Sequence, residues 1–309
     1  MRTGGASPPV RLPAALTQAQ ALHPRVEQAL QRARREEGAQ RLNLTDPDTV
    51  MVKSRQGTAP GYNAQAVVVP LAIAPGEPAG RLVTAVGVVA AASDAGQLPP
   101  LLAEATATTG QTAPVTLADG GCHAGPTVVA GAAAGTRLVM PESQRRALRS
   151  PYHKDRFAYQ PATDSFLCPH GHALRYRHTK QRTGRPPARA YRAGAICRGC
   201  SGFGRRRHDW HQGRVLELGL SDPALRAHRT RMASAAAQRL AHRRSGLVEG
   251  GFGVLKEVMG ARRFLLRGLA NVHAEWALLA TAFNLRRLWR VWRYTRRGGA
   301  PLRLIASPG

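Results

Sequence analysis

The sequence has no apolar run that approaches the ~20 residues needed to span a membrane. Its first 24 residues also lack the continuous apolar stretch of a secretory signal peptide, so a cytoplasmic location is expected. It contains only four cysteines, and in the cytosol metal binding or free thiols are commoner than disulfides. These absences exclude a membrane-spanning helix and disfavour a secreted, disulfide-stabilised chain.

Acidic and aromatic residues are also scarce. The 309 residues include 18 Asp and Glu against 45 Lys and Arg, giving a formal net charge of +27, and only 5% are aromatic. A GC-rich coding bias could replace lysine by arginine, but it does not explain the excess of basic over acidic residues. A field this positive predicts binding to a polyanion, most commonly nucleic acid. An acidic membrane surface is the alternative, although no basic amphipathic helix with an aromatic face stands out.

Changes in composition divide the chain into five segments. They are a lead-in with a short charged helix at residues 1–40, the first part of an α/β core at 41–141, a basic Cys- and His-containing insertion at 142–220, a helical second part of the core at 221–295, and a tail at 296–309. With 43% apolar residues, the chain can bury one large core that carries insertions.

The first part of the core alternates β-rich and helix-like runs in a definite order. Three strands, a helix, a strand, a helix and a strand are expected at residues 42–46, 62–71, 82–91, 98–107, 115–117, 126–134 and 137–140. This order is that of an RNase H-like α/β fold, a mixed sheet flanked by helices. After the insertion a long helical stretch is expected over residues 223–293. Four glycines between positions 246 and 253 weaken it, since each costs about 1 kcal/mol in a helix.

Two acidic residues lie where predicted strands end: Asp46 after the first strand and Asp119 after the fourth. Strand ends hold carboxylates rigidly, and such groups can converge on two divalent metal ions, the arrangement that phosphoryl transfer uses. Asp48 lies two residues after Asp46 and is an alternative ligand. For either residue alone, an Asp that caps a turn is the simpler explanation.

Glu249 is the third candidate, in the glycine-rich part of the helical stretch. On an ideal α-helix Lys256 falls within about 20° of Glu249 around the axis, with Phe252 nearby. One helix face would then carry a metal-binding carboxylate, a packing aromatic ring and a phosphate-binding ammonium group. From spacing alone, an amphipathic helix with an incidental ion pair explains the pattern better.

Several motifs in a fixed order resemble those of insertion-sequence DDE transposases, over roughly residues 40–290. They are Asn-Leu-Thr-Asp-Pro-Asp at 43–48, Gly-Tyr-Asn-Ala-Gln-Ala-Val at 61–67, Leu-Ala-Asp-Gly-Gly-Cys at 117–122, and the C-terminal stretches 252–260, 262–269 and 275–278. The resemblance implies the RNase H-like catalytic domain of a mobile element, in a branch with a Cys-containing insertion. It also implies DNA as the partner, both at transposon ends and at the target.

The resemblance assigns roles by position. Asp46, Asp119 and Glu249 would hold two Mg²⁺ or Mn²⁺ ions during DNA cleavage at transposon ends and strand transfer into target DNA. Because two ends must be brought together, a homodimer is expected, acting at the nucleoid in the bacterial cytoplasm.

Three basic residues follow from the same carry-over. Lys256 would contact terminal phosphate, Arg244 is the nearest match to the family's upstream arginine, and Arg263 lies in a C-terminal motif assigned to DNA binding. On an ideal helix Arg244 is about 140° from Glu249 around the axis.

The sequence also departs from the family pattern. Family tyrosines fall at Ala241 and Cys122 here, and relatives carry a longer N-terminal region with a helical DNA-binding part, which is apparently lacking. The alternative to an active transposase is therefore a truncated, catalytically inactive remnant that only binds DNA.

The insertion contains a possible structural zinc site. Its thiol ligands would be Cys168, Cys197 and Cys200. A tetrahedral site needs four Cys or His ligands, and His170 or His172 could complete this one. Related transposases have a further cysteine where Arg206 stands here, so a degraded knuckle without metal is the alternative.

Arginines of the insertion are expected to contact phosphate. They are Arg182, Arg185, Arg189 and the run at 205–207. Such contacts give affinity and salt dependence rather than sequence choice. A solvated, disordered basic loop is the alternative.

Some remaining residues favour simple structural roles. Trp276, Trp289 and Trp292 are expected to pack in the core or between helices rather than to stack on nucleobases. His123, beside the second acidic motif, is expected to be a surface histidine with its hydrogen bonds satisfied.

Overall fold

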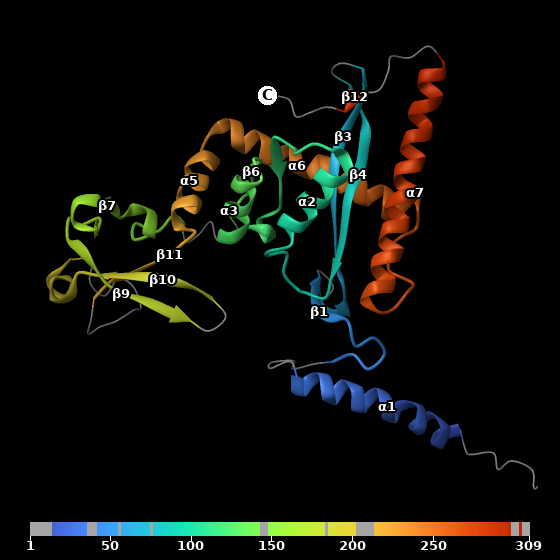
Figure 1. Ribbon diagram of the computed structural model, residues 1–309, viewed down its shortest axis with the longest axis horizontal. Coiled ribbons are helices and arrows are strands. Elements are labelled where there is room, and N and C mark those ends of the chain that lie inside the picture. Colours follow the sequence, from blue (N-terminus) through green and yellow to red (C-terminus); the bar gives the residue numbers. More distant parts are fainter. Residues whose placement is uncertain are drawn as a thin grey trace, which may run out of the picture.

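A computed structural model of the chain describes residues 14–35, 42–54, 57–74, 77–142, 148–182, 185–201, 213–297 and 303–304. Figure 1 shows a long hairpin of β3 and β4 with α7 along one side and α2 with its neighbouring elements on the other. A separate sheet, β7 to β11, lies beside α5. None of the described helices combines the length and apolar character needed to cross a membrane.

The hairpin of β3 (Asn63–Ala74) and β4 (Glu77–Val89) is antiparallel and corresponds to the predicted second and third strands. A short β12 (Arg303–Leu304) pairs with β3 at Leu71 and Ala72. The hairpin forms because β-branched valines recur through both runs, a composition that favours a pleated, half-buried surface. Alternate residues of β4 face opposite sides, so Val86 and Val88 pack towards α7 while Gly87 faces Leu101 of α2.

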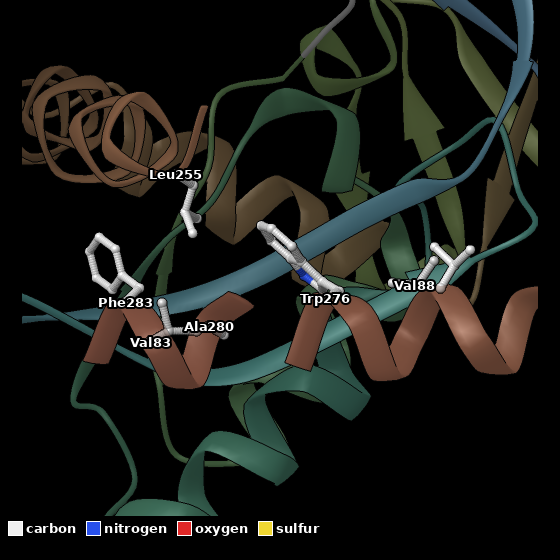
Figure 2. Packing of buried hydrophobic residues seen from close by; sticks show 7 residues of the cluster. Val83, Val88, Leu255, Trp276, Ala280 and Phe283 are labelled. Atoms are coloured by element: carbon white, nitrogen blue, oxygen red, sulfur yellow. The ribbon is translucent and has the colours of Figure 1, made fainter. Parts of the chain in front are cut away.

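The largest core cluster lies between this hairpin and the C-terminal helix α7 (Leu269–Arg296), as Figure 2 shows. Its buried members are Val83, Val88, Leu255, Val272, Trp276, Ala280 and Phe283. Two polar contacts fix the register of the helix on the hairpin. Trp276 Nε1 donates to the Gln65 carbonyl at 2.8 Å, and the Asn284 amide bonds both the N–H and the carbonyl of Val83.

The first strand differs from the prediction. Residues 42–49 form no strand; β1 (Val50–Ser54) begins after them and pairs with β2 (Gly57–Gly61). The Thr49 N–H donates to the Asp46 carbonyl at 3.1 Å, which closes a turn with Pro47 at its second position. Proline pre-sets the backbone angle of that position, so the Asp-Pro motif makes a turn before the strand instead of ending one.

The next part of the chain matches the prediction closely. It contains α2 (Leu98–Thr109), β5 (Val115–Leu117), α3 (Gly125–Ala133) and β6 (Arg137–Val139). β5 and β6 pair in parallel, as a strand–helix–strand unit requires. Their apolar side chains form a second buried cluster, and α3 approaches β6 so closely that a Cβ on Gly131 would collide with Leu138.

Residues of the insertion, expected to lack a regular pattern, form a five-stranded antiparallel sheet. Its strands are β7 (Ala158–Gln160), β8 (Ser165–Leu167), β9 (Ala173–Arg182), β10 (Arg185–Arg192) and β11 (Val215–Gly219), in the spatial order β11-β10-β9-β8-β7. Buried residues of several strands, Phe157, Phe166, Leu174, Tyr191 and Leu216, give the sheet a core of its own. The alternation of buried and exposed residues in these strands is hard to recognise in the sequence, because arginine occupies many of the exposed positions.

The predicted long C-terminal helix is divided into shorter ones. α5 (Asp222–Met232) and α6 (Ala235–Gly253) are separated at Ser234, whose hydroxyl accepts the Ala237 N–H as an N-cap. A π-helical turn (Val254–Val258) follows α6, and positive φ angles at Gly260 and Gly268 bound the loop before α7. At the other end of the chain, α1 (Ala14–Arg35) is the helix expected within residues 1–40, and its 22 residues make it longer than the short helix predicted.

An ionic network joins the insertion sheet to α5. The Arg229 guanidinium donates to Glu142 at 2.8 Å and to Asp155 at 2.9 Å, and Lys154 pairs with Asp222 at the start of α5. The Arg229 side chain is only 12% exposed, so its two carboxylate partners replace the water that it loses.

Two histidines meet beside this network. The ring of His228, 1% exposed on α5, lies 5.4 Å from the ring of His123, and no described atom hydrogen-bonds the buried Nε2 of either. His123 is therefore not the satisfied surface histidine expected from sequence. Burial lowers the pKa of His228 to about 4, helped by His123, Arg231 and Arg229 and opposed by Glu142. Burial also lowers the pKa of His123.

We predict that this pair makes the fold acid-sensitive. Because the folded pKa of His228 lies below the unfolded value of about 6.5, the unfolded chain takes up the proton first, and stability falls as the pH drops from 6.5 towards 4. Between pH 7 and pH 5 this group alone should lower the free energy of unfolding by about 2 kcal/mol. Urea titrations of the wild type and of His228→Phe check this: an equal pH dependence in both proteins would contradict it.

Candidate functional site

Asp46 is buried and held by its neighbours. It is 7% exposed, Tyr62 Oη lies 2.8 Å from both of its carboxylate oxygens and donates to them, and the Gly268 N–H donates to Oδ1 at 3.3 Å. Burial and the carboxylate together raise the pKa of Tyr62 above its usual value, so this hydroxyl keeps its proton. Asp46 thus joins the start of the hairpin to the loop before α7. Its role as a metal ligand stays a prediction.

Asp48, the alternative first ligand, lies at the start of α7. Its Oδ2 accepts the Leu269 N–H at 2.9 Å. A carboxylate at this position satisfies a helix-terminal N–H group and interacts favourably with the positive end of the helix dipole. The two acids of the Asp-Pro-Asp motif therefore hold adjacent residues of one loop, Gly268 and Leu269.

Asp119 is accessible. It follows β5, caps the short 3₁₀ turn Gly120–Cys122 through a 2.6 Å hydrogen bond from the Gly120 N–H, and its side chain is 62% exposed. Arg244 Nη2 on α6 lies 4.0 Å from Asp119 Oδ2. The structure thus brings together two of the residues selected from sequence, an exposed carboxylate and a guanidinium from a distant element.

Asp94 is an acidic residue that the sequence analysis missed. Its Oδ1 accepts hydrogen bonds from Asn63 at 2.6 Å and from Gln65 at 2.9 Å. Its Oδ2 would lie 2.6 Å from a Cβ on Gly121, so only glycine fits there. The criterion applied to Asp46 and Asp119, an acid placed after a predicted strand, could also have found Asp94 after the strand at 82–91.

Cys122 reports the field of these two acids. Burial, together with the negative charges of Asp94 and Asp119, raises the pKa of its thiol to about 11 against the opposing charge of Arg244. The thiol is therefore protonated at neutral pH. Asp94, Asp119, Cys122 and Arg244 together constitute what we call the Asp119 cluster.

Glu249 and Lys256 do not share one continuous α-helix. Glu249 is exposed on α6, which ends at Gly253, and Lys256 is exposed in the π-helical turn that follows. A π turn contains more residues than an α turn, so the predicted alignment of the two side chains does not carry across the junction. Phe252 does pack as expected, stacked on Trp276 with ring centroids 5.8 Å apart. Arg263 is exposed in the loop after the π turn.

The glycine-rich helix α6 is held by an arginine of β4. Arg81 Nη2 donates to the Gly246 carbonyl, and a Cβ on Gly250 would collide with the same guanidinium. Arg81 therefore replaces part of the stability that the glycines remove from α6, and the absent side chain at position 250 makes room for it. This contact positions the helix that carries both Arg244 and Glu249.

The described residues contain no group of three or more His, Cys, Asp or Glu side chains that could hold a metal ion. Carboxylates are the right donors for Mg²⁺ or Mn²⁺. However, Asp46 is engaged by Tyr62 and Gly268, whereas Asp119 and Glu249 are exposed on separate elements. The arrangement as it stands does not fit a two-metal centre.

The structure gives the zinc hypothesis no support. Cys168 forms a tight turn in which its carbonyl accepts the Gly171 N–H at 2.9 Å, and Cys197 and Cys200 bracket another turn. In the part of the chain that is described, these thiols form no metal-binding group. His208 and the arginines at 205–207 lie outside the described residues, and zinc stays a prediction.

Comparison with known families finds a match over part of this chain. Residues 167–289 match the family model described as "Transposase DDE domain". This stretch is similar to transposase DDE domains. It covers β9 to α6 and most of α7, and so includes Arg244, Glu249 and Lys256. The mixed α/β architecture is consistent with an RNase H-like DDE domain. No curated protein and no solved structure matches the chain.

Much of the region predicted to be an insertion lies inside the matched stretch. The match begins at residue 167, just before Cys168, and therefore takes in β9, β10 and β11. These strands of the arginine-rich sheet thus fall within the stretch that matches the family model.

We predict different effects for two glycines of α6. Gly250→Ala should displace Arg81, and the loss of its hydrogen bond to Gly246, worth about 1 kcal/mol, should cancel most of the gain in helix propensity and leave the free energy of unfolding nearly unchanged. Gly246→Ala, where a Cβ meets nothing within 4 Å, should raise it by up to about 1 kcal/mol through helix propensity. Chemical denaturation followed by circular dichroism measures both. Equal effects would show that Arg81 does not constrain α6.

Proposed function

We propose that this chain is the transposase of a bacterial insertion sequence, which cleaves DNA at the ends of the element and joins the freed 3′-hydroxyl to target DNA. The match of residues 167–289 to the transposase DDE domain is the observation that carries the proposal. The charge of +27 supports DNA as the partner, because neutralising phosphates releases counterions and drives binding.

The Asp119 cluster is the proposed reaction centre. Asp119 is exposed to an incoming phosphodiester, and Arg244 stands near enough to bind a phosphate oxygen that approaches it. Asp94 and Gly121 would hold the Asp119 loop against β3 through the Asn63 and Gln65 side chains. The resemblance assigns Asp46 and Glu249 as the other acids of a DDE set for Mg²⁺ or Mn²⁺, but in the described structure Asp46 is engaged by Tyr62 and Gly268, so the proposed centre rests on Asp119 and Arg244.

The sheet β7–β11 is proposed as a DNA-contacting surface. Its exposed residues Arg175 and Arg177 lie on β9, and the Arg189 guanidinium on β10, which pairs with Asp164, lies 4.7 Å from the centroid of the Tyr176 ring. Basic side chains in such a row would position the DNA backbone without reading its sequence. Two chains acting together would bring the two transposon ends into one complex, so a homodimer is part of the proposal.

Substitution of Asp119 by Asn tests the proposed centre. Asp119→Asn should lower the rate of cleavage of a DNA substrate carrying the element's own ends by about 100-fold or more, the scale of losing a group that stabilises the transition state. Glu257→Gln is the matched control, because it also removes one exposed negative charge, from an acid that is ion-paired with Arg262. Both variants should bind DNA with the affinity and salt dependence of the wild type.

The assay uses Mn²⁺ and gel analysis of the cleaved strands. Cleavage by Asp119→Asn at the wild-type rate would show that the centre lies elsewhere. A wild-type chain that binds the ends but does not cut them would overturn the proposal in favour of a protein that only binds DNA.

A further inference from the structure

Helix α7 has two faces of different character. Its inner face packs against the hairpin through Val272, Trp276 and Phe283. Its outer face exposes Trp289 and Trp292, at 54% and 52%, which the sequence analysis expected to be packed. Of the three tryptophans in this region, only Trp276 is in the core. The outer face is therefore a basic amphipathic surface with exposed aromatic rings, which inspection of the sequence did not distinguish.

The exposed rings form a regular array with arginines. The Arg293 guanidinium lies 4.7 Å from the Trp289 ring centroid, and the Arg296 guanidinium lies 4.9 Å from that of Trp292. Both pairs have i, i+4 spacing, so the four side chains occupy an arc of about 100° on one side of the helix. Each arginine lies over one face of its ring, so the surface presents guanidinium groups beside half-exposed indole rings.

Positive charge on this helix is not balanced locally. Residues 276–297 contain six arginines and no acidic residue. The last acid before them, Glu275, already accepts the N–H groups of Leu265 and Leu266. Among the described residues, none of the six arginines forms an ion pair with a carboxylate. Burial and the charges of Arg290, Arg81 and Arg286 lower the pKa of Arg287, as expected where like charges crowd together.

We propose that the outer face of α7 from Trp289 to Arg297, which we call the Trp–Arg face, binds the phosphodiester backbone of DNA. A guanidinium stacked on an indole keeps its N–H edge free and loses little further entropy when it binds a phosphate with two hydrogen bonds. The surface shares no residue with the proposed reaction centre, whose side chains come from α6 and from the loops that follow β4 and β5. The choice of DNA as the polyanion rests on the proposed function, whereas the geometry of the face is independent of that function.

A second copy of this chain fits the face less well. A symmetric contact would bring the arginines of one Trp–Arg face against those of another, with no acid between residues 276 and 297 of either copy to pair with them. A phosphodiester chain provides a row of negative charges instead, which complements arginines spaced along a helix.

The test compares two double variants that remove the same charge. Arg293→Gln/Arg296→Gln removes the stacked pairs, and Arg137→Gln/Arg156→Gln removes two exposed arginines elsewhere. Fluorescence anisotropy measures binding to a short labelled duplex, without divalent metal, at several salt concentrations. The first variant should bind about 10-fold more weakly at low salt and lose about 1.8 from the slope of log K against log salt, corresponding to two phosphate contacts. The control should keep nearly the wild-type slope.

Equal salt slopes for the two double variants would overturn the proposal. Intrinsic fluorescence gives a second readout: DNA should change the tryptophan emission of the wild type, and Trp289→Phe/Trp292→Phe should lose most of that change while buried Trp276 remains. Two other outcomes, each with unchanged DNA affinity, would also overturn the proposal. A changed sedimentation coefficient without DNA would make the face a protein contact, and changed binding to anionic vesicles would make it a membrane contact. These experiments measure DNA binding and not cleavage. Their outcome therefore tests the Trp–Arg face even if the chain proves unable to cleave DNA.

Discussion

The rest of the structure depends on the burial of Trp276 against β3. Its indole N–H donates to the Gln65 carbonyl, and its ring stacks on Phe252 at the end of α6. Through these contacts one side chain joins the hairpin, α6 and α7, and a buried tryptophan is among the largest single contributions that a core can receive. The Gln65 side chain then continues the connection to Asp94, which lies against the Asp119 loop. The proposed reaction centre is thus positioned from a core more than 150 residues away in sequence.

Several acids of this chain are held by contacts inside the fold. Asp46 and Asp48 accept N–H groups beside α7, Asp94 accepts two side-chain amides, and Glu142 and Asp155 pair with Arg229. With 45 basic against 18 acidic residues in the chain, its net charge stays strongly positive.

The parts of the fold predictable from sequence were those determined by local pattern. The unit from Leu98 to Val139 alternates helix and strand signals clearly, and it forms as expected. The strand predicted to end at Asp46 was wrong because Pro47 starts a turn, and the sheet of the insertion was missed because arginine fills many of its exposed positions. The sequence also did not predict which side of α7 is buried, because apolar residues occur all round that helix. Its packing on β4 determines that Trp276 is buried while Trp289 and Trp292 are exposed.

For the candidate site, the sequence provided Asp119 and Arg244 but not their proximity, which arises because α6 passes β5. Asp94 was accessible to the same reasoning and was overlooked.

The contact between Arg81 and α6 constrains how these positions can change during evolution. Because the guanidinium occupies the space that a side chain at position 250 would need, a larger residue there moves Arg81 away from the Gly246 carbonyl. Positions 81 and 250 should therefore covary among relatives, with a bulkier residue at 250 favoured where the arginine has been replaced.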